Sequence, residues 1–158
     1  MRIMFISLLG LWLTACSAAV TPTALTPVAP ETPPPTIEPL RAGVLAIYRQ
    51  QGCFVGLDET LIVHFDGTLD FAAARGTAQQ AQIAIEELAE LQDLLAQPEF
   101  AELEALYQAV GDDLCVYTIT ARRAGQSFAI TTMDGAATPE FLQQVIDAAA
   151  RLRRRIKA

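Results

Sequence analysis

The sequence contains little of the chemistry that most enzymes and metalloproteins require. It has one histidine and three cysteines in 158 residues. Structural and catalytic zinc sites need several such side chains at short spacing, so this inventory argues against a zinc centre. The sequence also lacks a Gly-x-Ser-x-Gly motif, a phosphate loop and a dinucleotide-binding fingerprint. We therefore expect no catalytic residues, no metal and no cofactor, and we predict that the protein is not an enzyme.

Two local features could suggest chemistry but have simpler interpretations. The single histidine, His64, falls on the polar side of a predicted strand, where a surface role is more common than pairing with a catalytic cysteine. Residues 66–70 contain two aspartates but lack the length and terminal glutamate of a calcium-binding loop. We interpret this segment as a hairpin turn.

Positive charge is also scarce. Eleven Lys and Arg residues stand against eighteen Asp and Glu, and the pI is about 4.6. Binding to phosphate backbones requires a basic face, so nucleic acid is not an expected partner. Five of the cations lie within the last eight residues. They either complement the dipole of a C-terminal helix or contact anionic lipid or an acidic partner.

No apolar run is long enough to span a bilayer. The longest, residues 3–15, has thirteen residues and would form a helix of roughly 20 Å, against a hydrocarbon core of ~30 Å. With Arg2 before it, this run is typical of a signal peptide over residues 1–15. The following residues, Leu13-Thr14-Ala15-Cys16, match the bacterial lipobox.

The lipobox predicts that Cys16 is lipidated after cleavage of the signal. The acyl chains would anchor the protein to a membrane on its non-cytoplasmic face, at the cell surface or on the periplasmic side. The alternative is an ordinary secretory signal followed by a free cysteine. Residues 16–40, which hold most of the prolines, would then form an extended Pro/Thr-rich tether.

The remaining residues, 41–158, are predicted to form one α+β domain. Alternating apolar residues indicate strands over 44–49, 61–65, 69–71, 115–121 and 127–132, while residues 72–84 show no clear period. Helical spacing begins near residue 84 and restarts after Pro98, where an apolar stripe runs to Tyr107. A last helix follows Thr138 as N-cap and Pro139 as first helical residue. The predicted order is βββααββα, an antiparallel sheet of about five strands with helices on one face.

The alternation also predicts the register of one hairpin. A three-residue loop over 65–67, with Gly67 in the left-handed conformation, places Val63 opposite Leu69 and Leu61 opposite Phe71 on one face of the sheet. A two-residue loop would split these apolar side chains between the two faces.

Cys53 and Cys115 remain once the lipobox cysteine is set aside. Each lies beside a predicted strand, and a compartment outside the cytoplasm permits oxidation. The pair forms either a disulfide or two buried thiols.

The domain resembles the emfourin family of small inhibitors of thermolysin-like metallopeptidases over about residues 44–152. The resemblance rests on Tyr48-Arg49 followed by 52–57 (Gly-Cys-Phe-Val-Gly-Leu), which is similar to the family's Arg-x-Gly-Gly-Phe-x-Gly opening. It continues in Leu94-Leu95 with Phe100, in Asp113 followed by Tyr117-Thr118-Ile119, and in Asp134 with Pro139. Cys53 replaces the usual second glycine, and Leu114 replaces a glycine that commonly follows the aspartate. Because both cysteines are additions to the family pattern, the resemblance favours their pairing.

The resemblance implies a non-catalytic protein-binding domain that inhibits a secreted thermolysin-like metallopeptidase by occluding its cleft. The loop from Gly52 to Leu57 is the expected binding segment, with Phe54 and Leu57 as anchors and Val55 and Gly56 beside them. Phe54 could instead be a core aromatic that caps the sheet. The alternative function is an envelope lipoprotein with a structural or assembly role that shares the fold without binding a protease.

Overall fold

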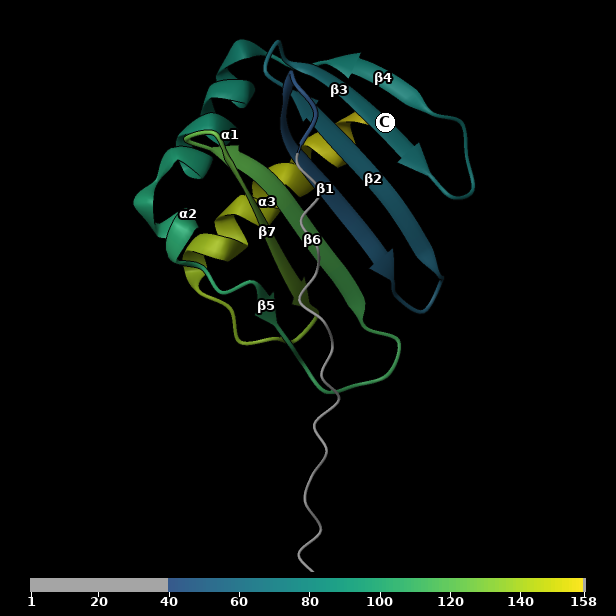
Figure 1. Cartoon of the computed structure of the whole chain (residues 1–158). Coiled ribbons are helices and arrows are strands. Elements are labelled where there is room, and N and C mark those ends of the chain that lie inside the picture. Colours follow the sequence, from purple (N-terminus) through teal and green to yellow (C-terminus); the bar gives the residue numbers. More distant parts are fainter. Residues whose placement is uncertain (1–39, 158) are drawn as a thin grey trace, which may run out of the picture. The chain divides into compact units, whose positions relative to one another are not determined.

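The computed structural model describes residues 40–157, which form one sheet with helices against it (Figure 1). The predictions for the signal peptide, for Cys16 and for the tether up to residue 39 lie outside the described residues. The strands are β1 (Val44–Gly52), β2 (Leu57–His64), β3 (Thr68–Ala73), β4 (Gln79–Gln82), β5 (Leu106–Tyr107), β6 (Cys115–Arg123) and β7 (Gln126–Met133); the helices are α1 (Ile85–Ala96), α2 (Pro98–Glu102) and α3 (Glu140–Ile156).

The α+β class is confirmed, but the sheet has seven strands rather than about five. Its order is β4-β3-β2-β1-β6-β7-β5, and all pairs are antiparallel except β5 with β7. The two unpredicted strands are the two edges. β4 is short, polar and mostly exposed, and β5 has only two residues, so neither carries an apolar alternation that a sequence pattern could reveal.

The predicted hairpin register is confirmed. Val63 pairs with Leu69 and Leu61 with Phe71, and all four side chains are buried. Gly67 has a φ of 83°, which is the left-handed conformation expected for the last residue of this loop.

The three helices cover one face of the sheet, and the opposite face carries no helix among the described residues. On α1, Leu88, Leu91 and Leu95 are buried as the spacing predicts. Ile85 was expected on the same face but is 76% exposed, because it is the first residue of the helix and precedes the turns that contact the core.

Two other helix predictions were wrong. The second apolar stripe does not continue as a helix, since α2 ends at Glu102 and the next apolar residues, Leu106 and Tyr107, form strand β5 against β7. At the last helix, Thr138 does not act as the N-cap. Pro139 occupies the cap position without a side-chain hydrogen bond, and the helix begins at Glu140. Proline cannot donate a backbone hydrogen bond and suits a helix start at either position.

The hydrophobic core lies between the helices and the covered face of the sheet. Phe100 has no exposed surface, and its ring packs edge to face on Phe128 with centroids 6.2 Å apart. Leu142 and Val145 of α3 are equally buried above β-strand residues such as Ile119. The short α2 therefore serves mainly to place one aromatic ring in the core.

We expect Phe100→Ala to lower the free energy of unfolding by about 3–5 kcal/mol, because it removes a fully buried ring from a packed core. Urea denaturation of the full chain followed by circular dichroism would measure this change. Phe65→Ala is the matched control, since Phe65 is 45% exposed in a turn, and its effect should stay below about 1 kcal/mol. Equal losses for the two variants would contradict the packing described.

Candidate functional site

The segment expected to bind a partner, Gly52 to Leu57, forms the connection between β1 and β2. Phe54 is 88% exposed and Val55 is 66% exposed at the tip of this hairpin, so the interpretation of Phe54 as a core aromatic was wrong. Gly56 is also exposed, whereas Leu57 is half-buried as the first residue of β2. An exposed phenylalanine next to an exposed valine is an arrangement that solvent disfavours and that a partner surface can bury.

The backbone of this hairpin is unusual at three positions. Gly52, Cys53 and Gly56 have φ values of 76°, 57° and 64°. Glycine adopts this left-handed conformation without strain, but a residue with a side chain does so at some cost. The turn is closed by the Gly56 N–H, which donates to the Cys53 carbonyl at 3.0 Å. Strained backbone of this kind is concentrated at functional sites.

Cys53 and Cys115 are joined as a disulfide with their Cα atoms 4.2 Å apart. The alternative, in which the two cysteines are separate buried thiols, is therefore wrong for this structure. The Cys53 N–H also donates to the Leu114 carbonyl at 3.2 Å, so the hairpin is attached to the start of β6 by a covalent bond and a hydrogen bond.

A third segment is hydrogen-bonded to the backbone of Cys115. The Asp134 carboxylate, just after β7, accepts hydrogen bonds from the Cys115 N–H at 3.2 Å and from the Tyr117 hydroxyl at 2.8 Å. Burial, together with this hydrogen bond and the negative charge of Asp134, raises the pKa of Tyr117 to about 12. Tyr117 therefore stays protonated and keeps donating throughout the physiological pH range.

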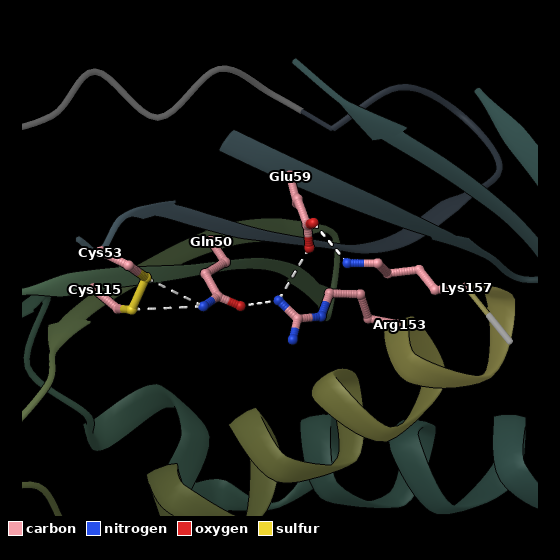
Figure 2. Close-up of polar contacts among 6 residues, drawn as sticks. All are labelled: Gln50, Cys53, Glu59, Cys115, Arg153 and Lys157. Carbon is pink, nitrogen blue, oxygen red and sulfur yellow. Dashed lines mark hydrogen bonds and ion pairs between the residues drawn. A yellow bond between two sulfur atoms is a disulfide. The ribbon is translucent and has the colours of Figure 1, made fainter. Parts of the chain in front are cut away.

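Beside the disulfide lies a polar network that was not predicted (Figure 2). Its members Gln50 and Glu59 are buried, whereas Lys157 is exposed. The Gln50 amide nitrogen faces both sulfur atoms, at 3.5 and 3.6 Å, and its oxygen accepts from Arg153 of α3. Arg153 also donates to the Glu59 carboxylate at 3.2 Å, and Lys157 donates to the other Glu59 oxygen at 2.7 Å. These contacts connect the end of α3 with β2 and with the base of the hairpin.

The sequence did carry a signal for this network. Alternate residues of β1 face the core, and Gln50 continues the series Ala46 and Tyr48. In β2, Glu59 begins the core-facing series that continues with Leu61 and Val63. A buried polar side chain needs partners, and a buried carboxylate needs a cation. Polar residues at core-facing positions of two strands therefore indicate that partners lie elsewhere in the chain.

The C-terminal cations lie at the end of α3, with Arg153, Arg154 and Arg155 in its last turn, which agrees with the expectation that they complement the helix dipole. Most of them also form ion pairs that were not expected. Besides Arg153 and Lys157, Arg151 pairs with Glu90 and Arg155 pairs with Glu87, both on α1. Arg154 is the one cation of this group without an ion pair among residues 40–157. The basic end of α3 thus attaches the helix to acidic residues of its own domain.

A cleft of about 280 Å³ lies between the sheet and α3. It contains two cations, Arg153 and Arg154, and two carboxylates, Asp134 and Asp147. Asp134 is engaged as described above, and Asp147 accepts a hydrogen bond from Gln143 on the next turn at 3.1 Å. Both carboxylates of the cleft are thus engaged by neighbouring groups within residues 40–157. Two buried polar atoms of the cleft, Thr132 Oγ1 and Arg153 Nε, have no hydrogen-bond partner among residues 40–157.

A further titratable pair, His64 with Asp70, lies on the open face of the sheet. His64 Nε2 is 2.7 Å from a carboxylate oxygen of Asp70, whose other oxygen accepts from Gln80 at 2.8 Å. The hydrogen bonds from Gln80 and His64 lower the pKa of Asp70. No cysteine lies in this group. Within residues 40–157, no cluster of three or more His, Cys, Asp or Glu side chains is arranged to hold a metal ion.

No protein-family model matches the chain, and no curated protein matches it. The distinguishing feature of the site is an exposed apolar hairpin loop held by a disulfide.

We expect the stability of the protein to fall as the pH drops below about 4.5, partly because of Glu59. Burial opposes ionisation of Glu59, but the hydrogen bonds from Lys157 and Arg153 outweigh it, so the pKa of Glu59 in the folded protein lies below its usual value of 4.5. The folded state then binds fewer protons than the unfolded state. The stabilisation is complete above the unfolded pKa and is lost as the pH falls through the folded pKa.

Urea midpoints measured at several values between about pH 7 and pH 3 would test this expectation. Glu59→Gln should be less stable than the parent at neutral pH and should lose less stability on acidification. Glu86→Gln is the matched control, because Glu86 is exposed and has no ion pair among the described residues. The same pH slope for the parent and Glu59→Gln would show that Glu59 contributes nothing to acid sensitivity.

Proposed function

We propose that this protein is a membrane-anchored extracytoplasmic lipoprotein whose domain binds another protein through residues 52–57. The partner we propose is a secreted thermolysin-like metallopeptidase, which the hairpin loop would inhibit by occluding its cleft. The observation that carries the binding proposal is the exposure of Phe54, 88%, on a loop fastened by the Cys53–Cys115 disulfide.

The physical argument for binding is the combination of an apolar tip with a rigid base. Burying Phe54 and Val55 against a partner would remove apolar surface from water and provide most of the affinity. Because the disulfide and the β1–β2 pairing already hold the loop, little conformational entropy is lost when the partner binds. A rigid apolar loop of this kind can enter a cleft without being remodelled.

The peptidase assignment is supported by the backbone at the resembling motif. Emfourins have two adjacent glycines where this chain has Gly52-Cys53, and both residues here adopt the left-handed conformation that glycine favours. A Cβ at Gly52 would approach the Leu114 carbonyl oxygen to 2.8 Å, so this position requires glycine. The loop conformation thus agrees with the glycine-rich opening on which the resemblance depends.

The proposed anchor is supported by the lipobox Leu13-Thr14-Ala15-Cys16 and by the disulfide, which is typical of proteins in oxidising compartments. The lipid on Cys16 would be the attachment to the membrane. No helix within residues 40–157 has the length and apolar character needed to cross a bilayer.

Phe54→Ser should weaken inhibition of a susceptible thermolysin-like peptidase by about 30-fold or more, the effect of losing an anchor worth about 2 kcal/mol. The full chain would be titrated against a panel of such peptidases with a peptide substrate. Phe65→Ser is the matched control, because Phe65 is an exposed phenylalanine in the turn at the other end of β2.

The parent and Phe65→Ser should inhibit equally. If the folded parent inhibits no peptidase of the panel at micromolar concentration, the inhibitor assignment is wrong, and the structural or assembly role becomes the better interpretation. Equal inhibition by Phe54→Ser and the parent would show that the loop is not the binding segment.

Cys16→Ala should release the protein from the membrane fraction, because the variant has no thiol at the position that the lipobox marks for acylation. Fractionation of expressing cells followed by immunoblotting would measure this release. Ser17→Ala, which keeps the lipobox intact, should remain with the membranes. Unchanged retention of the Cys16→Ala protein would contradict lipidation.

A further inference from the structure

A second loop adjoins the proposed binding hairpin and has the same character. The segment between β5 and β6, residues 108–114, ends at Leu114, whose carbonyl accepts the Cys53 N–H. Gly52 pairs with Cys115 in the sheet, and a Cβ at Gly111 would come within 3.2 Å of the Leu114 side chain. Figure 1 shows the β1–β2 and β5–β6 connections at the same end of the sheet. We call residues 53–56 and 108–114 together the loop edge.

The loop edge gathers a large part of the exposed apolar surface of the described residues. Six large hydrophobic side chains are exposed within residues 40–157. Three of them, Phe54, Val55 and Val110, lie on these two loops. Val110 is fully exposed and contributes nothing to the core. Such a concentration on loops that are anchored to each other indicates an interaction surface.

The charge of the loop edge has one sign. Asp112 and Asp113 are exposed on it, and neither loop contains Lys or Arg. The nearest cation on β1, Arg49, is neutralised by two hydrogen bonds to the Asp58 carboxylate, each 3.1 Å long. A partner that buries Phe54, Val55 and Val110 in an apolar recess would therefore gain affinity from basic side chains around that recess.

The two loops are joined by the Cys53–Cys115 disulfide and by the hydrogen bond from the Cys53 N–H to the Leu114 carbonyl, next to backbone in the left-handed conformation. Only three residues other than glycine have positive φ in the described chain, and two of them, Cys53 and Asp113, lie on the loop edge. They are on opposite sides of the disulfide, which joins Cys53 to the residue two positions after Asp113. Loops restrained in this way lose little entropy on binding, so they can recognise a partner by shape.

We infer that the loop edge is one continuous binding surface for a protein with an apolar recess bordered by Lys or Arg side chains. This inference rests on the protein-binding part of the proposed function and does not depend on the partner being a peptidase. A second copy of this chain is a poor occupant, because two acidic edges would repel each other. Anionic lipid is unfavourable for the same reason.

The test is selection of peptides against the full chain from a display library of random linear peptides. Selected peptides should carry net positive charge together with apolar residues, and they should bind more weakly as salt concentration rises. Val110→Ser and Phe54→Ser should each weaken binding about tenfold or more. Asp112→Asn with Asp113→Asn should reduce the salt dependence, and asparagine tolerates the positive φ at position 113.

Ile85→Ser is the matched control, because Ile85 is equally apolar, 76% exposed and located on α1 away from these loops. Its binding should equal that of the parent. The inference is overturned if no peptide is selected, if the peptides are neutral or acidic, or if Val110→Ser binds them as the parent does.

The outcome can be separated from that of the inhibitor assignment. Peptide selection that succeeds while no peptidase is inhibited would support the loop edge and contradict the peptidase as partner. If Phe54→Ser loses inhibition while Val110→Ser and the double asparagine variant inhibit as the parent does, the inference that the two loops form one binding surface is wrong. The β1–β2 hairpin alone would then be the inhibitory segment.

Discussion

The buried carboxylate of Glu59 imposes a constraint that the rest of the domain satisfies. An ionised group under a helix is stable only if cations and hydrogen-bond donors reach it, and Arg153 and Lys157 do so from the last turns of α3. Because both cations come from the same helix, α3 must cross the sheet with its C-terminal end above β2. Lys157 also lies over the ring of Phe71, 5.7 Å from its centroid.

The same network reaches the proposed binding loop. Arg153 donates to Gln50, and Gln50 places its amide nitrogen against both sulfurs of the disulfide. The hairpin 53–56 is thus supported from below by the helix and from the side by β6 (Figure 2). The exposed apolar tip is built on a part of the domain that is held by covalent, ionic and hydrogen-bonding contacts together.

Sequence patterns predicted the elements that depend on local periodicity. The alternation around Val63 and Leu69 fixed a hairpin register, and the spacing of Leu88, Leu91 and Leu95 located α1. The edge strands escaped prediction because β4 is a polar segment whose pairing with β3 supplies its structure, and β5 is too short for any period. The intrinsic β-sheet propensity of a segment is easily overridden where tertiary contacts determine its secondary structure.

The candidate site was likewise predictable from the sequence only in part. The loop from Gly52 to Leu57 could be named from its residues, but whether Phe54 faces water or the core depends on the path of the chain after Gly52. The position of the Val110 loop beside the β1–β2 hairpin and the partners of Glu59 depend on contacts between residues far apart in sequence, which no local pattern records. The ion pairs of the C-terminal arginines were missed for the same reason.

The central position of β1 gives the disulfide a further consequence. β1 pairs with β2, which follows it directly, and with β6, which is synthesised more than sixty residues after Cys53. A shift of one residue between β1 and β6 would turn every side chain of β6 to the opposite face and carry the Cys115 sulfur away from Cys53. Closure of the bond therefore selects one register. Oxidation preserves a correctly assembled sheet and leaves slipped pairings free to rearrange.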